Sequence, residues 1–326
     1  MVRRFIFLLA GLAVFCSRPA LHAADKKPNK LQAPNNNGVK FGKVTTQRWQ
    51  VGVILSARNG GCRELISTIP VPTDWPEQKA RIVDEEISAF AHVDYRMLDN
   101  GVKQMVVSIP HLPAGQVARV LVTFEVERSQ ILAPVDPSLF SIPKRLPREL
   151  SKYLAASPYI ETRHPDIIKA AKEAVEGKES AWDQVEAIYD WVRDHVKYQN
   201  GELKGAAAAL RDKTGDCEEM TSLFIAMCRI HKIPARTVWI PDHCYPEFYL
   251  VDNEGQGHWI PCQAAGTRDF GNMPEFRPVL QKGDNFTVPE KKKPQRYVAE
   301  FLTGKPDGAG GGAPAHEFVR KLMNVP

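Results

Sequence analysis

One segment of the chain has residues suited to nucleophilic catalysis, and it contains a cysteine. Cys217 falls within Thr214–Phe224, TGDCEEMTSLF, between an acidic turn and an amphipathic helical pattern. Three interpretations are open: a nucleophile, half of a disulfide, or a small buried apolar side chain. Asp216 can cap a helix and Glu219 follows three residues later, so the pattern places Cys217 in the first helical turn. Unpaired N–H groups and the helix dipole favour a thiolate there, and the thiolate is the form that attacks an acyl carbon.

The acidic neighbours of Cys217 would oppose a thiolate if they faced the sulfur, so a cationic partner is needed. His243 is the leading candidate, because it begins a strand downstream of the cysteine helix and a histidine can later protonate a leaving group. If the next strand runs antiparallel, the amide oxygen of Gln263 can orient the His243 ring. His231 lies at the far end of the helix and His258 has the wrong parity relative to Gln263, which makes both weaker candidates.

Several short motifs occur together around these residues. They are Gly215-Asp216-Cys217-Glu218-Glu219, Ile233-Pro234-Ala235-Arg236, His243 with Glu247, and Trp259-Ile260-Pro261, accompanied by Tyr189-Asp190-Trp191-Val192 and Tyr198. The combination, over residues 159–263, resembles the transglutaminase-like superfamily, bacterial relatives of transglutaminases with a papain-like fold. The resemblance implies a catalytic triad with Cys217 as nucleophile and His243 as general base and acid. The family usually has aspartate where Gln263 stands, so the third member of the triad would here be a neutral amide.

Two functions are compatible with these residues. The first is a cysteine enzyme that forms a thioester at Cys217 with a protein or peptide amide and passes the acyl group to water or to an amine. The second is a catalytically silent domain that binds peptide or protein. We expect no cofactor, and the cysteines lack the C-x-x-C spacing of zinc sites. The chain has no D-x-D-x-D-G calcium loop, and the sequence leaves calcium dependence open.

The N-terminus carries the features of a secretory signal peptide. Arg3 and Arg4 precede an apolar run, Phe5–Phe15, and small residues follow at Ala23 and Ala24. We therefore expect an exported protein, periplasmic or secreted, with no membrane segment after cleavage. Loss of the three arginines of residues 1–24 leaves 40 basic against 38 acidic residues. Such a balanced chain, without a clustered basic face, gives no support for a nucleic-acid partner.

The surrounding pattern predicts an α+β protein in several parts. Val120, Val122, Phe124 and Val126 alternate with polar or outward residues as in a strand, and Asn100-Gly101 between two such runs predicts a tight hairpin. We expect a β-sandwich-like domain, then a papain-like domain in which a cysteine-bearing helix packs on an antiparallel sheet. The predicted parts are a signal peptide (1–24), a flexible leader (25–44), the β-sandwich-like domain (45–130), a connection (131–150), the transglutaminase-like domain (151–303) and a flexible Gly/Pro-rich tail (304–326).

The remaining cysteines raise the question of a disulfide. Removal of Cys16 with the signal leaves five, an odd number, and Cys228 reads as a buried residue of the helix interior. If His243 and Gln263 face each other on antiparallel strands, then Cys244 and Cys262 also face each other, behind the sheet and away from the catalytic cleft. A disulfide between them and two buried thiols remain equally open.

Overall fold

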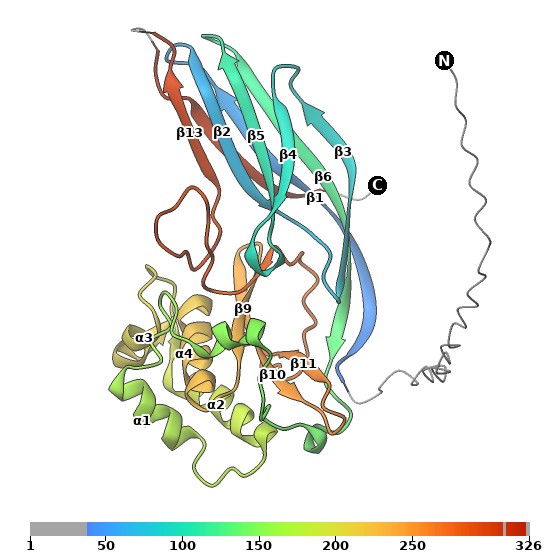
Figure 1. The fold of residues 1–326 in the computed structure, drawn as a ribbon, viewed down its shortest axis with the longest axis vertical. Coiled ribbons are helices and arrows are strands. Elements are labelled where there is room, and N and C mark those ends of the chain that lie inside the picture. The colour runs from blue at the N-terminus through green and yellow to red at the C-terminus, as the bar shows by residue number, and fades with distance from the viewer. Residues whose placement is uncertain (1–37, 309–310, 324–326) are drawn as a thin grey trace, which may run out of the picture. The chain divides into compact units, whose positions relative to one another are not determined.

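The computed structural model describes residues 38–308 and 311–323. The predicted signal peptide and residues 25–37 of the predicted leader lie outside the described residues. The described residues belong to one compact unit that begins at Asn37. It contains a β-sandwich and a mixed region of helices and strands (Figure 1).

Two four-stranded antiparallel sheets form the β-sandwich. One has the strand order β14-β1-β6-β3 and the other β13-β2-β5-β4. Apolar side chains from both sheets meet in one core, among them Val53, Leu65, Val107 and Val122. This arrangement confirms the predicted sandwich. The strands are β1 (Lys40–Ser56), β2 (Cys62–Val71), β3 (Gln78–Ile87), β4 (His92–Met97), β5 (Lys103–Leu112), β6 (Val117–Leu132), β13 (Phe301–Pro306) and β14 (Ala315–Met323).

The hairpin between β4 and β5 turns at the predicted dipeptide. Asn100 has φ 63° and Gly101 has φ 76°, within the short 3₁₀ turn Asp99–Gly101. Both residues tolerate positive φ better than others do, which is why Asn-Gly marks tight hairpins. The hairpin prediction is therefore confirmed.

Both ends of the sandwich differ from the prediction. Strand β1 starts at Lys40, and its first residues pair with the end of β6, so residues 40–44 are not part of a leader. The prediction of a flexible tail over 304–326 is also wrong, because β13 pairs with β2 and β14 pairs with β1. Strand β14 lies at a sheet edge with mostly exposed or half-exposed side chains, so it lacks the strong alternation by which a strand is recognised.

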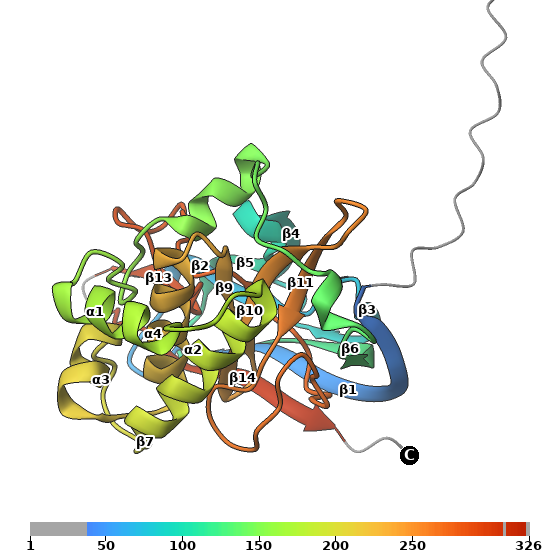
Figure 2. The ribbon, with the colours of Figure 1, turned by 90° about the horizontal axis from the view of Figure 1, so that it is seen from below.

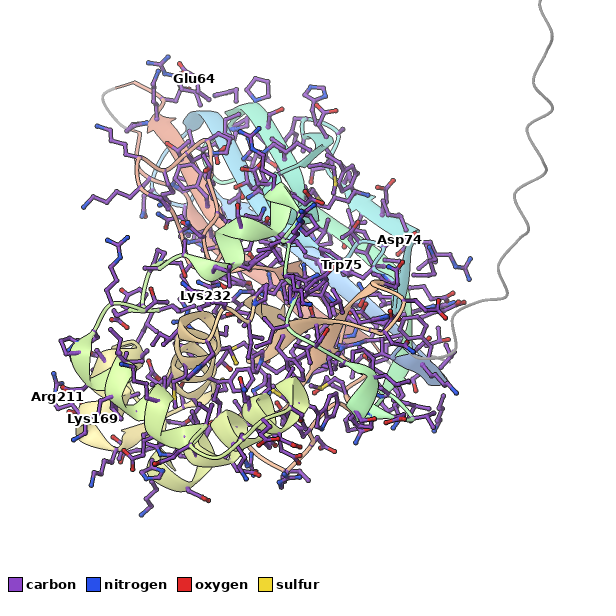
Figure 3. The ribbon with its side chains drawn as sticks, turned by 60° about the horizontal axis from the view of Figure 1, so that its bottom comes forward. Glu64, Asp74, Trp75, Lys169, Arg211 and Lys232 are labelled. Carbon is purple, nitrogen blue, oxygen red and sulfur yellow. The ribbon has the colours of Figure 1, made fainter. Side chains whose placement is uncertain are left out.

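The segment between β6 and β13 contains all the helices of α type in the described residues. They are α1 (Pro165–Ala174), α2 (Ala181–His195), α3 (Ala206–Asp212) and α4 (Cys217–Ile230), preceded by 3₁₀ turns at Pro137–Leu139 and Arg148–Leu154. Charged side chains such as Lys169 on α1 and Arg211 on α3 extend outward from them (Figure 3). None of the helices in the described part of the chain is long and apolar enough to cross a membrane.

A third antiparallel sheet supports α4. Its order is β11-β10-β9-β12, with β9 (Ala235–Ile240), β10 (His243–Val251), β11 (Gly257–Pro261) and β12 (Gln281–Lys282). Helix α4 packs on β9 and β10 (Figure 2). Phe224 and Phe248 belong to the core between them. A short parallel pair, β7 (Lys197–Tyr198) and β8 (Thr214–Gly215), leads into α4. The predicted packing of a cysteine-bearing helix on an antiparallel sheet is confirmed.

Candidate functional site

The start of α4 is fixed by a capping box. The Asp216 carboxylate accepts from the Glu218 N–H at 2.8 Å, and the Glu219 carboxylate accepts from the Asp216 N–H at 3.2 Å. Gly215 leaves the space this requires, because a Cβ there would lie 2.5 Å from that of Glu219. Two of the three acidic neighbours of Cys217 therefore serve as helix caps, and Cys217 occupies the first helical position as predicted.

His243 contacts both of its predicted partners. It follows Asp242, whose left-handed conformation (φ 57°) turns the chain from β9 into β10. The His243 Nε2 atom lies 2.9 Å from the Gln263 Oε1 atom, and the ring also hydrogen-bonds with Cys217. Because an amide oxygen only accepts, Nε2 carries the proton of that bond and Nδ1 is left for the thiol. The structure thus brings Cys217, His243 and Gln263 together in a row.

Gln263 is held from its backbone. Its N–H donates to the Asp269 carbonyl at 2.8 Å, and its carbonyl accepts from Arg193 Nη1 of α2 at 3.0 Å. The side chain is therefore presented to His243 from a fixed main chain. This is the support that an orienting residue needs, since a misplaced acceptor would let the imidazole rotate.

The surroundings of Cys217 favour its thiolate. Hydrogen bonds from the Cys244 thiol and from His243, with the positive charge of His243, lower the pKa of Cys217 to about 4 although burial opposes this. Burial acts to lower the pKa of His243, but its hydrogen bonds to Cys217 and Gln263 raise the pKa overall. Between these two pKa values the pair is a thiolate beside an imidazolium. That pair is the reactive form of a cysteine nucleophile.

The other candidate histidines have different partners. His231 Nε2 lies 2.8 Å from the Ala171 carbonyl oxygen, and His258 Nε2 lies 2.9 Å from Asp252 Oδ2. Neither ring is among the groups around Cys217. Their weaker ranking in the sequence agrees with these positions.

A pocket of about 850 Å³ opens over Cys217 and His243. Aromatic side chains line much of it, and charged groups complete the wall. Arg320 comes from β14, so the sandwich contributes directly to the pocket. Its wall includes Tyr159, Tyr198, Glu218, Trp239, Arg296, Tyr297 and Arg320.

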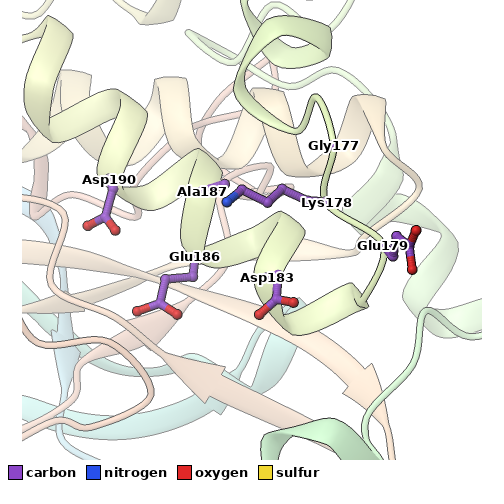
Figure 4. Close-up of a pocket in the computed structure, with 7 residues that line it drawn as sticks. All are labelled: Gly177, Lys178, Glu179, Asp183, Glu186, Ala187 and Asp190. Atoms are coloured by element: carbon purple, nitrogen blue, oxygen red, sulfur yellow. The ribbon is translucent and has the colours of Figure 1, made fainter.

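A second, smaller pocket lies along α2. It has a volume of about 480 Å³ and is lined by Lys178 and by acidic side chains including Glu186 and Asp190 (Figure 4). It contains neither a cysteine nor a histidine, and Arg268 already pairs with both of those carboxylates. Among the described residues, no group of three His, Cys, Asp or Glu side chains is placed to hold a metal ion.

The predicted pairing of Cys244 with Cys262 is wrong. In the β10–β11 hairpin Glu247 faces Pro261 and Phe248 faces Ile260, a register two residues away from the expected one. Cys262 then bonds through its N–H to the Pro246 carbonyl, while Cys244 faces Trp239 of β9. All five cysteines of the described residues are free.

The side chains of these two cysteines also lie on the helix side of the sheet, not behind it. The Cys244 sulfur lies 3.9 Å from the hydroxyl of Thr221, one turn after Cys217. Cys262 belongs to the core beneath α4, together with Cys228, which is buried as predicted. The expected face was wrong because His243 and Cys244, although adjacent at the start of β10, both hydrogen-bond with Cys217 and so do not point to opposite faces.

Two residues of the site were not predicted from the sequence. Arg296 contacts the first turn of α4 from 78 residues downstream, and Cys244 hydrogen-bonds with Cys217. No local pattern marks Arg296, since it lies in an irregular segment next to a lysine-rich loop. Adjacency to His243 was the one signal that Cys244 offered.

Comparison with known proteins agrees with this geometry. Residues 168–264 match the family model described as the transglutaminase-like superfamily. A candidate cysteine protease from Cytophaga hutchinsonii has a similar fold, with a TM-score of 0.54 and 16% identity over 87% of this chain and 94% of that chain. A candidate protease from Parabacteroides distasonis reaches a TM-score of only 0.27 at 12% identity, over 67% of this chain and 48% of that one. No curated protein matches the chain. Residues 168–264, which hold Cys217, His243 and Gln263, therefore form a domain of the transglutaminase-like superfamily.

Proposed function

We propose that this protein is a cysteine enzyme that cleaves amide bonds of proteins or peptides through a thioester at Cys217. The observation that carries the proposal is the position of His243, between the Cys217 thiol and the Gln263 amide oxygen. A ring held in this way can stabilise the thiolate as an imidazolium and then transfer its proton to the departing amine.

The reaction is balanced without any further group. The Cys217 thiolate adds to the amide carbonyl, and the C–N bond breaks as the amine takes the proton of the His243 imidazolium. The thioester remains, and His243 is neutral. Water or a primary amine, deprotonated by His243, then displaces the thiolate and regenerates the pair. The first acceptor gives hydrolysis and the second gives acyl transfer, and both are included in the proposal.

The test uses the purified protein and a mixture of unstructured proteins with a fluorescent primary amine. Incorporation of the amine at glutamine reports acyl transfer, new chain termini report peptide hydrolysis, and conversion of glutamine to glutamate reports deamidation. After an acid quench, an acyl adduct is expected on the peptide that contains Cys217. If no adduct and no product form and Cys217 is alkylated no faster than an ordinary thiol, the domain is a silent module that binds peptide or protein.

Replacement of Gln263 by glutamate is expected to extend activity to higher pH. Glutamate keeps the length of glutamine, so its carboxylate can take the place of the amide oxygen 2.9 Å from His243 Nε2. A negative charge at that distance stabilises imidazolium and should move the basic limb of the pH–rate profile up by about one pH unit or more. Gln263→Leu is the matched control: it removes the acceptor and should lower the rate by roughly 10²-fold. Identical profiles for all three proteins would mean that another residue orients the ring.

We also propose that the enzyme acts outside the cytoplasm. The support is the sequence of residues 1–24, with its two arginines, apolar run and small residues at Ala23 and Ala24. Sequencing of the mature N-terminus after expression of the full chain tests this. A product that still begins at Met1 in the cytoplasmic fraction would contradict it.

A further inference from the structure

The third acidic neighbour of Cys217 is not a helix cap. Glu218 lies directly after the nucleophile, and its side chain lines the same pocket. Burial raises the pKa of Glu218 overall and the charge of Arg296 opposes this, so Arg296 favours the charged form of Glu218. A Glu218 carboxylate without that cation would repel a thiolate and oppose its formation. The chain must therefore hold or neutralise this charge if Cys217 is to act as a nucleophile.

Arg296 is placed to do this. Its Nε atom lies 3.1 Å from Glu218 Oε2, its Nη2 donates to the Glu218 carbonyl at 3.1 Å, and its Nη1 donates to the Ser222 hydroxyl at 3.0 Å. The arginine side chain is only 5% exposed, and its guanidinium lies 5.1 Å from the centre of the Trp239 ring. A buried guanidinium that bonds both the backbone and the side chain of one turn fixes that turn as well as its charge.

We propose that Arg296 is a positioning residue of the site, which neutralises Glu218 and fixes the first turn of α4 so that the carboxylate beside Cys217 does not repel a thiolate. The inference rests on the proposed role of Cys217 as nucleophile. It is independent of substrate, because it concerns only the ionisation of the thiol.

Most of the other charged and titratable groups around Cys217 have partners that the proposal leaves unchanged. Those on α4 act as caps, those on β10 bond the thiol directly, and the nearby arginine of the loop before β12 pairs with Glu275 at 2.6 Å. These groups are Asp216, Glu219, Tyr198, His243, Cys244 and Arg277. The pocket wall also holds Asp242, Lys293 and the ion pair of Arg320 with Glu300. Arg296 is thus the cation that pairs with Glu218 in the described residues.

The test measures alkylation of Cys217 by iodoacetamide as a function of pH, by mass spectrometry of the peptide that contains it. Arg296→Gln should move the midpoint of the rate profile up by about one pH unit or more, because Glu218 loses its counter-charge. Arg296→Lys keeps the positive charge, so its midpoint should stay close to that of the wild type. The double variant Arg296→Gln with Glu218→Gln removes both charges. Its midpoint should return most of the way to the wild-type value. If Arg296 had a purely structural role, the added Glu218→Gln substitution would not reverse the shift of the midpoint.

Several results would overturn the inference. An unchanged midpoint in Arg296→Gln would do so, and so would a double variant that keeps the full upward shift. If Arg296→Gln does not fold, Glu218→Gln carries the test, since it leaves Arg296 unopposed and should move the midpoint down. A wild-type midpoint near 8.5, that of an ordinary thiol, would instead contradict the proposed function itself.

Discussion

Cys217→Ala is expected to lose amide cleavage and acyl transfer by a factor of at least about 10⁴, while the protein remains folded. Alanine cannot form the thioester, and the remaining His243 and Gln263 side chains only bind or orient. The fold should survive because Cys217 is only half-buried at the start of α4, where it lies at the edge of the core and lines the pocket. The measurements are turnover of the substrate found with the wild type and the midpoint of thermal unfolding.

Cys228→Ala is the matched control for this prediction. It makes the same substitution in the same helix, but at a side chain that is fully buried in the core beneath α4. It should retain turnover and lose stability by roughly 1 kcal/mol. Turnover of Cys217→Ala within tenfold of the wild type would place the nucleophile elsewhere. An equal loss in both variants would show that the assay reports folding and not chemistry.

Lys282→Met is expected to destabilise the protein by about 3–5 kcal/mol. The Lys282 ammonium lies 2.6 Å from Glu77, just before β3 of the sandwich, and 2.7 Å from Glu247 on β10. None of the three side chains is more than 3% exposed. Arg236 still pairs with Glu247 in the variant, but Glu77 keeps a buried charge without its cation. Urea unfolding, followed by fluorescence, measures the loss.

Two further variants serve as controls for the Lys282→Met prediction. Lys305→Met breaks an ion pair with Glu64 in which both side chains are more than half exposed, and it should cost at most about 1 kcal/mol. Glu77→Gln added to Lys282→Met should recover part of the loss, because it removes the stranded charge. A cost for Lys282→Met no larger than that for Lys305→Met would show that water replaces the lysine at this position.

The same ion pairs predict how the loss depends on pH. Burial acts to raise the pKa of Glu247, but Lys282 and Arg236 hold it below its usual value. A carboxylate with a lowered folded-state pKa stabilises the protein above its unfolded pKa of about 4.3 and loses this contribution as the pH falls through the folded value. The difference between wild type and Lys282→Met is therefore expected to be largest at neutral pH and to shrink below about pH 4.

The parts of the site that were predictable from sequence depend on local signals. Asp216 and Glu219 form their capping box within a single turn, so the position of Cys217 could be inferred without any knowledge of the fold. The contact between Gln263 and His243 was also expected, although by a register that is wrong. The hairpin loop turns about Glu254, through backbone bonds between Asp252 and Gln256, and this sets the register two residues away. Gln263 reaches His243 from beyond the end of β11.

The features that could not be predicted depend on contacts between distant segments. Arg296 acquires its role only when the chain folds back over α4, and nothing in its neighbours indicates Glu218 as the partner. Strand β14 is recognisable only by its pairing with β1, because an edge strand needs no apolar side chains on its outer face. The Gly-rich stretch before it reads as the start of a disordered tail, although it is a connection between two strands.

The pairing of β14 with β1 determines when the fold can be completed during synthesis on the ribosome. Among the strands of the described residues, β1 leaves the ribosome first and β14 last, with the segment that carries Cys217 between them. Until Ala315–Met323 emerges, one edge of β1 has no neighbour on the growing chain, and Arg320 is missing from the wall of the pocket. Cys217 can thus take its place at the start of α4 before the pocket above it is complete. A message that ends early would yield a chain with a thiol in an open, unfinished site and an exposed strand edge ready to pair with a neighbour.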